Sequence, residues 1–312
     1  MKFRFDNMDA SENVFFSRQL ENIRSQAFEV QYAELKGVKL VPAKTDFHPG
    51  VEEYTYRVFD KVGRAIVSSN ASEKGPRVDL KGFETTTKFK TLKDSYGYNI
   101  QEARNAMMAN LDLNGRKAKA ARDAIATLND DAILLGANGT NLQGTGFSGL
   151  FTLTGTETFT VPNGGAGSTL WTTKTPDEIV QDMHGMVFQV EQNSFEVEQC
   201  DTLVLPLARK GLVSSTRMGD GSNQTILSHF LETNGSIKQV EFSQKLNSNT
   251  AWTGARAMAY KKDPSKLECL IAVEFEQLPP QYDGYEVLTH CQARVGGTVI
   301  YFPKSAIYAD NI

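Results

Sequence analysis

The chain has 312 residues, of which 40% are hydrophobic and 22% are charged, and its formal net charge is -4. The length suggests about two domains, and the composition is typical of globular proteins, which excludes a disordered or fibrous chain. Because the basic residues are spread along a slightly acidic chain, we expect no general attraction to nucleic acid phosphates. No apolar run reaches membrane-spanning length and no signal peptide core is present, so we expect a soluble cytoplasmic protein without membrane contact.

The spacing of cysteine and histidine residues argues against metal, disulfide and nucleophilic chemistry. The cysteines are far apart and form no CxxC pair: Cys200, Cys269 and Cys291. We predict that they are buried and reduced and that they act as small hydrophobic residues. The histidines are dispersed, and no HExxH, GxSxG or Walker A motif occurs. We therefore expect no catalytic residue, no metal and no cofactor.

The N-terminal part is predicted to be an amphipathic arm followed by an extended connector. Residues 11–32 carry apolar residues at helical spacing after Ser11, which can cap a helix. Between residues 36 and 50 this pattern ends, and Leu40-Val41 before Pro42 is expected to be extended. We therefore expect a stretched connector to join the arm to the next element, so that the arm does not pack onto that element at once.

Residues 53–59 and 83–92 are predicted to pair as a long antiparallel ribbon. Alternation in the first segment places Tyr54, Tyr56 and Val58 on one side, and the second segment is rich in β-prone threonine. Polar turn residues between the two segments suit the tip of such a ribbon. Because a two-stranded ribbon with few large apolar residues is marginally stable alone, we expect it to contact something outside its own domain.

Residues 112–136 are predicted to form the long helix around which the chain is organised, after a short helix at residues 100–110. Its apolar positions alternate in spacings of three and four: Ala118, Ala121, Ile125, Leu128, Ala132 and Leu135. This spacing is one stripe along a helix, and from Asn114 to Leu135 that helix would be about 33 Å long at 1.5 Å per residue. Asp112 or Asn114 can cap its start, and Gly136 suits a left-handed residue at its end.

Two further motifs look like ligand sites but are better explained as structure. Asp130 and Asp131 are adjacent, and adjacent residues on a helix point about 100° apart, so we expect both to be solvated. Residues 144–149 spell GTGFSG, which fits the nucleotide fingerprint GxGxxG. That fingerprint needs a strand before it and a helix after it, whereas here a predicted helix precedes it and β-like residues 151–161 follow. We interpret it as a glycine turn.

From residue 175 onward, helices and strands alternate without regular βαβ spacing. Thr175-Pro176-Asp177-Glu178 spells a capping box with proline at the first helical position, so a helix should begin there. Another short helix is predicted at residues 225–231. Strands are predicted at residues 201–207, 237–242, 256–260, 267–275, 285–293 and 298–302. Gly296 and Gly297 separate the last two, and the predicted fold class is α+β.

A series of motifs in a fixed order gives nearly the whole chain a resemblance to one family. They are Leu40-Val41-Pro42, residues 60–66, Tyr98-Asn99-Ile100-Gln101-Glu102-Ala103-Arg104, Gly146-Phe147-Ser148-Gly149-Leu150-Phe151, residues 175–182, residues 201–206, and Ala293-Arg294-Val295-Gly296-Gly297 with Pro303 and Ala306. With its arm, ribbon, long helix and two-part remainder, the chain resembles a tailed-bacteriophage major capsid protein of the Hong Kong 97 type. Encapsulin shells share that fold.

The resemblance implies a division of the chain into named parts. Residues 1–44 would form the N-arm and residues 50–96 an extended β-hairpin called the E-loop. Residues 97–174 would form the P domain, with the spine helix at residues 112–136 and the glycine-rich loop. Residues 175–282 would form the A domain, and residues 283–312 would return to the P domain as strands.

The resemblance also implies a structural function and a set of partners. Copies of the chain would assemble as hexamers and pentamers into an icosahedral phage head, part of a virion assembled in the host cytoplasm. Double-stranded DNA would be held by enclosure and not by specific binding. A separate scaffolding protein, a portal and decoration proteins are the further partners that the family suggests; because the chain begins directly with the arm, any scaffold is expected to be a separate protein or to be unnecessary.

The predicted contacts between subunits lie on the arm and the ribbon, because neither has a core of its own. They are Phe15, Phe16, Tyr54, Tyr56, Lys61, Arg64, Lys74 and Arg77. Some family members crosslink a ribbon lysine to a neighbour's asparagine; Lys61, Lys74 and Lys81 are available for this, but we expect them to be solvated. The alternative functions are an encapsulin-type nanocompartment shell that holds enzyme cargo and an enzyme that uses the glycine loop.

Overall fold

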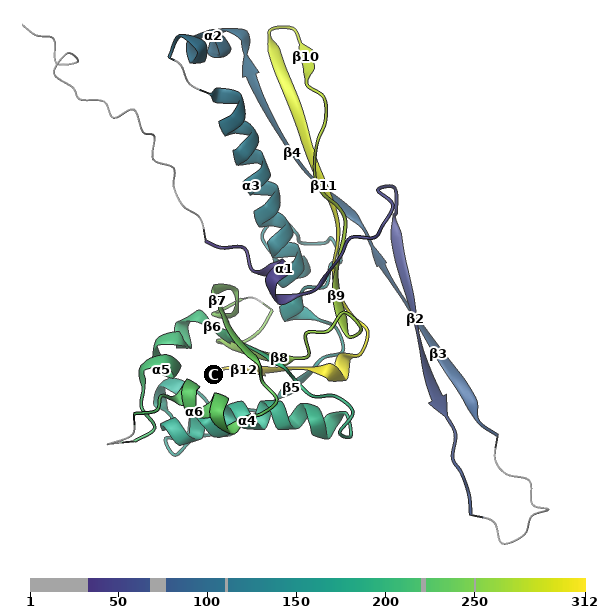
Figure 1. Cartoon of the computed structure of the whole chain (residues 1–312), viewed down its shortest axis with the longest axis vertical. Helices are drawn as coiled ribbons and strands as arrows, with labels where there is room; N and C mark the ends of the chain where they lie inside the picture. Colours follow the sequence, from purple (N-terminus) through teal and green to yellow (C-terminus); the bar gives the residue numbers. More distant parts are fainter. Residues whose placement is uncertain (1–32, 68–76, 110–111, 220–222, 250) are drawn as a thin grey trace, which may run out of the picture. The chain divides into compact units, whose positions relative to one another are not determined.

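The computed structural model describes residues 33–67, 77–109, 112–219, 223–249 and 251–312 (Figure 1). The chain divides into two units, Met1–Glu34 and Leu35–Ile312, and the elements described below belong to the second. The predicted helical arm, with Phe15 and Phe16, lies outside the described residues. Helices and strands mix without a regular βαβ alternation, so the predicted α+β class is confirmed.

The long helix α3, Leu113–Leu134, follows the short helix α2, Ile100–Met108, and both confirm predicted helices. Asp112 caps α3, because its carboxylate accepts a hydrogen bond from the backbone N–H of Gly115 at 2.9 Å. The chain leaves the helix through Gly136 at φ +58°, where a side chain would collide with the backbone of residues 147–149. All positions of the predicted stripe are buried or half-buried, so the sequence identified the core-facing side of α3.

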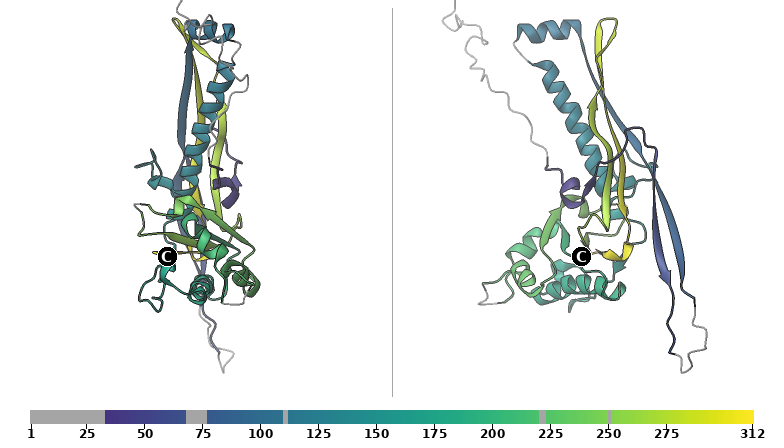
Figure 2. Two further views of the ribbon diagram at one scale, coloured as in Figure 1. Left: turned by 90° about the vertical axis from the view of Figure 1, so that its left-hand side faces the viewer. Right: turned by 45° about the vertical axis from the view of Figure 1, so that its right-hand side comes forward.

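The first sheet lies along α3 (Figure 2). Its strands are β1 (Ala43–Lys44), β4 (Lys90–Asn99), β9 (Leu267–Gln277), β10 (Gln281–Asp283) and β11 (Glu286–Ile300). The central strand β11 pairs antiparallel with both β4 and β9, and α3 packs against β4 and β11. The side chains between the helix and the sheet, such as Ile125, Ile271 and Val295, form the first hydrophobic core.

The strand β11 is one continuous strand where the sequence predicted two. Gly297 has φ +76°, and the pairing of β11 with β9 shifts register between Gln292 and Gly297. The strand nevertheless continues, because its pairing with β9 resumes from Gly297 opposite Leu270 to Ile300 opposite Leu267 and a β-bulge absorbs the irregular residues. The glycine pair therefore bends a strand, and the prediction that it separates two strands is wrong.

The second sheet has the strand order β5–β12–β8–β6–β7. Its strands are β5 (Glu157–Phe159), β6 (Thr202–Pro206), β7 (Gln239–Ser243), β8 (Arg256–Tyr260) and β12 (Ala306–Asp310). Because successive residues of a strand point to opposite faces, Leu203 and Leu205 enter a second core whereas Val204 enters the first. Residues of β8 and β12 alternate in the same way, so one face of this sheet packs in the first core and the other face packs in the second.

Helices α4 (Pro176–Asn193), α5 (Lys210–Ser215) and α6 (Ile226–Thr233) contribute to the second core. The predicted capping box is present at the start of α4, where the backbone N–H of Thr175 donates to the Glu178 carboxylate at 2.8 Å. A second hydrogen bond from the N–H of Gly165 also reaches Glu178, at 2.7 Å. These backbone donors lower the pKa of Glu178, so the start of α4 is fixed by a charged cap.

Strand pairing groups the C-terminal strands differently from the division expected from the sequence. Strand β9 lies within residues 175–282 yet joins the first sheet beside α3, and β12 lies within residues 283–312 yet joins the second sheet between β5 and β8. The reason is that strand partners depend on long-range register and on which face must be buried. Spacing along the chain does not specify either of these.

The segment expected to be an extended connector contains a helical turn, α1 (Gly37–Leu40). Leu40 and Val41 are 1% and 0% exposed and belong to the first core. The hydroxyl of Tyr260 donates to the carbonyl of Leu40 at 2.7 Å, which fixes the turn in place. The prediction that Leu40 is extended is wrong, because it ends a helical turn, whereas Val41 is extended as predicted; burial of both apolar side chains is favourable.

Asp130 and Asp131 are not solvated as predicted, because Lys245 binds both. Its Nζ atom contacts Asp130 and lies 2.8 Å from an oxygen of Asp131, and the backbone N–H of Gly37 donates to Asp130 at 2.5 Å. The two carboxylates leave α3 in different directions, but a flexible lysine can reach both. The pair therefore links α3 to α1 and to the segment after β7.

The GxGxxG segment is a turn, as predicted. Gly144 and Gly146 have φ of +75° and +74°, which favours glycine at both positions. The segment lies between two 3-10 turns, Gly136–Asn138 and Leu150–Thr152, so no α-helix begins directly after it to receive a phosphate. The expected β-like segment 151–161 contains the short strand β5.

Candidate assembly site

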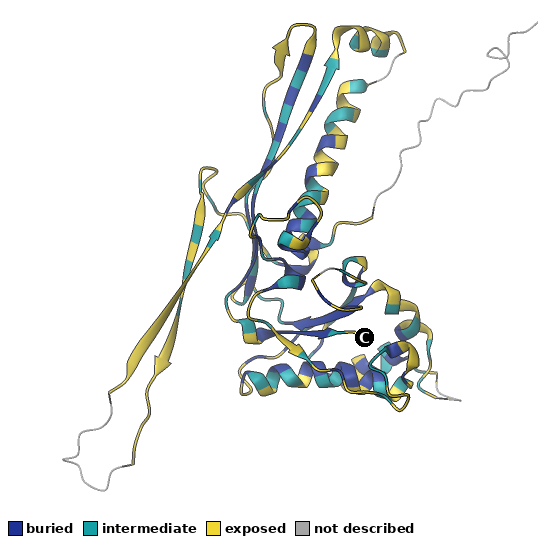
Figure 3. Cartoon of the chain, turned by 180° about the vertical axis from the view of Figure 1, so that it is seen from behind, coloured by how far each residue is buried: buried dark blue, intermediate teal, exposed yellow. Residues whose placement is uncertain are grey.

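The predicted ribbon is present as a hairpin of β2 (Glu53–Val62) and β3 (Asp79–Lys88). The strands pair antiparallel over ten positions, from Glu53 opposite Lys88 to Val62 opposite Asp79. They form a sheet of their own, and Figure 3 shows most of it exposed. Because residues directly opposite in an antiparallel pair share a face, this register defines two faces of the hairpin.

One face carries polar and charged pairs near the base of the hairpin. Glu53 and Lys88 lie 3.4 Å apart, and Arg57 and Glu84 lie 3.0 Å apart. Between them the hydroxyls of Thr55 and Thr86 are 2.9 Å apart. Exposed ion pairs each contribute about 0–1 kcal/mol, so these pairs help to set register but do not supply a core.

The other face is covered at the base by the chain itself. The ring of Tyr56 lies edge-on to that of Tyr301 with the ring centres 4.9 Å apart, and Tyr54 packs against Phe47 in the same cluster. The hydroxyl of Tyr56 donates to the carbonyl of Ile300 at 3.2 Å. The expectation that only neighbouring copies cover Tyr54 and Tyr56 is therefore wrong, since residues far away in the sequence cover part of both side chains.

A polar network joins this base cluster to the first sheet. The hydroxyls of Tyr54 and Tyr301 lie 3.1 Å apart, and Tyr301 donates to the carboxylate of Glu268 at 2.5 Å. Lys44 lies 3.6 Å from the same carboxylate. Burial, together with the hydrogen bond to Glu268, raises the pKa of Tyr301. The phenol therefore stays protonated at neutral pH and holds the base of the hairpin against β9 and β11.

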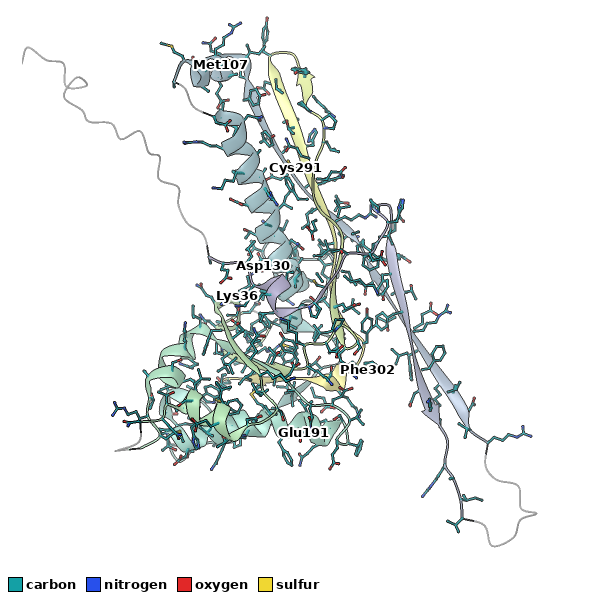
Figure 4. The ribbon with its side chains drawn as sticks, viewed as in Figure 1. Lys36, Met107, Asp130, Glu191, Cys291 and Phe302 are labelled. Carbon is teal, nitrogen blue, oxygen red and sulfur yellow. The ribbon has the colours of Figure 1, made fainter. Side chains whose placement is uncertain are left out.

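Beyond this base the hairpin exposes large apolar side chains on both faces. Phe59, Leu80 and Phe83 are 65%, 60% and 61% exposed. The ring of Phe59 covers Gly82 across the pair, so close that a Cβ there would lie 3.2 Å from it, which is the way aromatic residues stabilise a strand glycine. An open cavity of about 410 Å³ is lined among others by Val58, Phe59, Pro264 and Phe302, of which Phe302 is labelled in Figure 4. The distal half of the hairpin is thus an apolar surface without a cover.

The predicted contact residues fall into three groups. Lys61, Arg64 and Arg77 are exposed in the distal half, and Lys81 is exposed opposite Asp60. Tyr54 and Tyr56 are at the base. Phe15, Phe16 and Lys74 lie outside the described residues. The distal half thus carries basic side chains beside its exposed apolar ones.

The sequence analysis missed the apolar residues of the distal half. Phe59, Leu80 and Phe83 were not singled out, although the first lies in a predicted strand and the last begins the other. These residues could have been identified from the sequence, because they are large apolar residues on both strands of a ribbon that has no core in which to bury them. The prediction instead selected charged residues near the tip, because polar turn residues lie between the two strands.

The potential metal-ligating residues and the thiols of the described part of the chain bear on the sequence expectations about chemistry. Among the residues that the structure describes, no group of three or more His, Cys, Asp and Glu could hold a metal ion. The cysteines are buried and free, and burial raises the pKa of the Cys269 thiol to about 12, so it is not a nucleophile at neutral pH. No helix in the described ranges is both long enough and apolar enough to cross a bilayer.

Comparison with known proteins identifies the fold and the family of the chain. No curated protein sequence matches the chain. The structure is similar to the capsid of Myoviridae phage XM1, with a TM-score of 0.82 at 16% identity over 96% of this chain and 99% of that one. It is also similar to the capsid of a native GTA particle, with a TM-score of 0.65 at 11% identity over 94% and 96%.

A third similar structure comes from Mycobacterium phage Ogopogo, with a TM-score of 0.62 at 14% identity over 96% of this chain and 100% of that one. At such identities these likenesses show the fold, which is the Hong Kong 97-type capsid fold that the sequence predicted. A family model described as major capsid protein matches residues 63–312, which is most of the chain. This chain therefore belongs to the major capsid protein family, and its role is that of a structural protein of a capsid.

Proposed function

We propose that copies of this chain assemble as hexamers and pentamers into the icosahedral head of a phage that encloses double-stranded DNA. The observation that carries this proposal is the distal half of the hairpin, where Phe59, Leu80 and Phe83 are exposed on a two-stranded ribbon without a core. Exposed apolar surfaces of this kind mark protein–protein contacts. The membership in the major capsid protein family supports a second copy of the chain as the partner.

The proposed parts of the protomer follow its two sheets. Residues 1–44 are the N-arm and residues 50–96 the E-loop. The P domain is residues 97–174 with the spine helix α3, and the strands β9 and β11 belong with it because they pair beside α3. The A domain is the rest of residues 175–282, and β12 belongs with it because it pairs with β8.

The proposed role is structural and not enzymatic, and it needs no cofactor. DNA is held by enclosure, which agrees with a net charge of -4 that gives no general attraction to phosphates. The partners are other copies of the chain and, beyond them, a separate scaffolding protein, a portal and decoration proteins. The location is the virion, assembled in the host cytoplasm. The intersubunit contacts include Lys61, Arg64 and Arg77 beside the apolar residues of the distal half, and the ribbon lysines stay solvated and not crosslinked.

The test is electron microscopy of particles formed by the wild-type chain and by the double variant Phe59→Ser/Phe83→Ser. We expect closed shells from the wild type and a soluble protomer without shells from the variant, because the variant removes the apolar surface that a neighbour would cover. The matched control is Arg57→Ser/Glu84→Ser, which removes an exposed ion pair from the same hairpin and should assemble like the wild type.

Two outcomes would contradict the proposal. An unchanged yield of shells from Phe59→Ser/Phe83→Ser would show that the hairpin is not an intersubunit arm. Shells isolated from infected cells that hold a protein cargo and no DNA would identify a nanocompartment in place of a phage head.

A further inference from the structure

The turn after α4 holds two consecutive residues in a conformation that their side chains disfavour. Phe195 and Glu196 have φ of +55° and +64°, the left-handed region that favours glycine and asparagine. The turn is fixed at both ends, because the N–H of Glu196 donates to the carbonyl of Glu191 at 2.8 Å and the N–H of Glu198 donates to the hydroxyl of Ser194 at 3.0 Å. Such conformations cost free energy, and they concentrate at sites where function needs them.

The strained turn exposes two apolar side chains to solvent. Phe195 is 84% exposed and Val197 is 74% exposed, so the turn gains no core contact that would offset its cost. The ammonium of Lys304 lies 5.7 Å from the centre of the Phe195 ring. Among the described residues Lys304 has no ion-pair partner. We call this feature, Phe195 and Val197 with Lys304, the aromatic knob.

A cavity on another side of α4 has a mixed polar and apolar lining, which includes Thr233, Asn234 and Ser236. It has a volume of about 350 Å³ and lies between α4 and the segment after α6; its lining includes His184, Val187, Phe188 and Glu191. Phe188 is 57% exposed at its rim. The carboxylate of Glu191, labelled in Figure 4, has no ion-pair partner in the described part of the chain. We call this cavity the α4 pocket.

The knob and the pocket lie on different sides of the same helix. His184, Phe188 and Glu191 line the pocket on the side of α6. Another row of α4 faces β5, since Phe159 packs against Gly185 and Asn193 bonds to Glu157. At about 100° per residue the two rows are separated by roughly 130° around the helix. The knob is next to the second row, because α4 also contacts the 3-10 turn Pro303–Ser305 that carries Lys304.

We propose that Phe195 of one copy of the chain enters the α4 pocket of the next copy, with Lys304 of the first pairing with Glu191 of the second. Because the knob and the pocket are two different surfaces, their contact is head-to-tail, and such contacts form a ring when the rotation between successive copies closes. The inference rests on the proposed self-assembly and names a contact for it. The charges are complementary, since an unpaired ammonium meets an unpaired carboxylate, and an aromatic side chain supplies the buried apolar area.

The first experiment separates the knob from the strain of the turn. Phe195→Asn removes the ring but suits a left-handed backbone, so the protomer should be at least as heat-stable as the wild type while the yield of capsomers and shells falls about tenfold. The control Glu196→Asn relieves the same kind of strain and keeps the ring, and it should assemble like the wild type. Capsomers and shells are measured by sedimentation velocity on the full chain.

The second experiment tests the charge pair. Lys304→Glu and Glu191→Lys should each weaken assembly, because each places like charges together, and the double variant should restore it because the pair is reversed. Wild-type shells accompanied by unchanged assembly of Phe195→Asn, or by a double variant no better than the single ones, would overturn this contact and leave the proposed function intact. A wild-type chain that stays monomeric under assembly conditions would overturn both.

Discussion

At the scale of single residues, the most informative contacts join positions far apart in the sequence. Lys245 binds Asp130 and Asp131 of α3, and Asp130 also accepts a hydrogen bond from Gly37. The Asp130 side chain is almost fully buried whereas that of Lys245 is about one quarter exposed. A buried carboxylate without its cation is costly, so this pair controls how α1, α3 and the segment after β7 are held together.

We predict that Lys245→Met lowers the free energy of unfolding by about 1–3 kcal/mol, because it leaves Asp130 charged and buried without its main partner. The double variant Lys245→Met/Asp130→Asn should lose less, since asparagine can still accept the hydrogen bond from Gly37 and carries no charge. Urea unfolding of the protomer measures both. A single variant as stable as the wild type, or a double variant less stable than the single one, would contradict this account of Asp130.

At the scale of elements, other described segments of the chain contact the base of the hairpin, whereas the distal half of the hairpin is exposed. Tyr54 and Tyr56 fix the base through contacts with Tyr301 and the carbonyl of Ile300. Beyond them Phe59 and Phe83 face solvent. A two-stranded ribbon is at most marginally stable on its own, so the base contacts are what keep β2 and β3 paired and directed in an isolated protomer.

We predict that Tyr54→Ser/Tyr56→Ser leaves both cores folded but loosens the hairpin. The amides of β2 and β3 should exchange hydrogen about tenfold faster or more, because local opening no longer breaks the tyrosine contacts. Amides of the buried strand β6 serve as the internal control and should exchange at the wild-type rate. Equal protection of the hairpin in the variant and the wild type would show that the tyrosines do not support it.

At the scale of the whole described molecule, the second sheet connects the two cores. Its strands send alternate residues to each side, so that Leu203 packs in one core and Val204 in the other. Tyr260 and Tyr308 of the same sheet lie in the first core. Unfolding one core would expose one face of this sheet, which makes separate unfolding of the two cores unfavourable.

We predict that the three buried thiols become reactive together. Cys200 lies in the second core and Cys269 and Cys291 lie in the first, and burial raises the pKa of Cys269 to about 12, so little thiolate exists in the native state at neutral pH. Labelling by a thiol reagent along a urea series should show one midpoint for all three. An added exposed thiol, Thr55→Cys, should react without urea, and an earlier midpoint for Cys200 alone would mean that the second core unfolds separately.

Local sequence patterns predicted most helices and strands, but they did not predict which strands pair with one another. The stripe from Ala118 to Leu135 and the capping box at Thr175 gave α3 and α4, because helix formation depends on residues within a few positions of one another. The Hong Kong 97-type resemblance gave the fold. The glycines at 296 and 297 misled the strand prediction, because only the register of the neighbouring strand shows that they form a bulge.

The hairpin that carries the candidate assembly site was predicted from the sequence, but which of its residues the rest of the chain covers was not. Alternation identified the hairpin, yet it assigned the exposed role to Tyr54 and Tyr56, which Tyr301 covers from far away in the sequence. The knob at Phe195 had no sequence signal, since a left-handed phenylalanine is recognisable only from its backbone angles.

The sequence by itself determined α2, α3, α4 and α6, the hairpin, the α+β class and the absence of recognised catalytic motifs, because these depend on the order and type of neighbouring residues. Tertiary structure alone decided which sheet receives β9 and β12, which carboxylate becomes buried beside Lys245, and which apolar residues the chain leaves uncovered. The physical reason is that burial is a property of the packed molecule: a side chain becomes core or contact surface only when distant segments do or do not cover it.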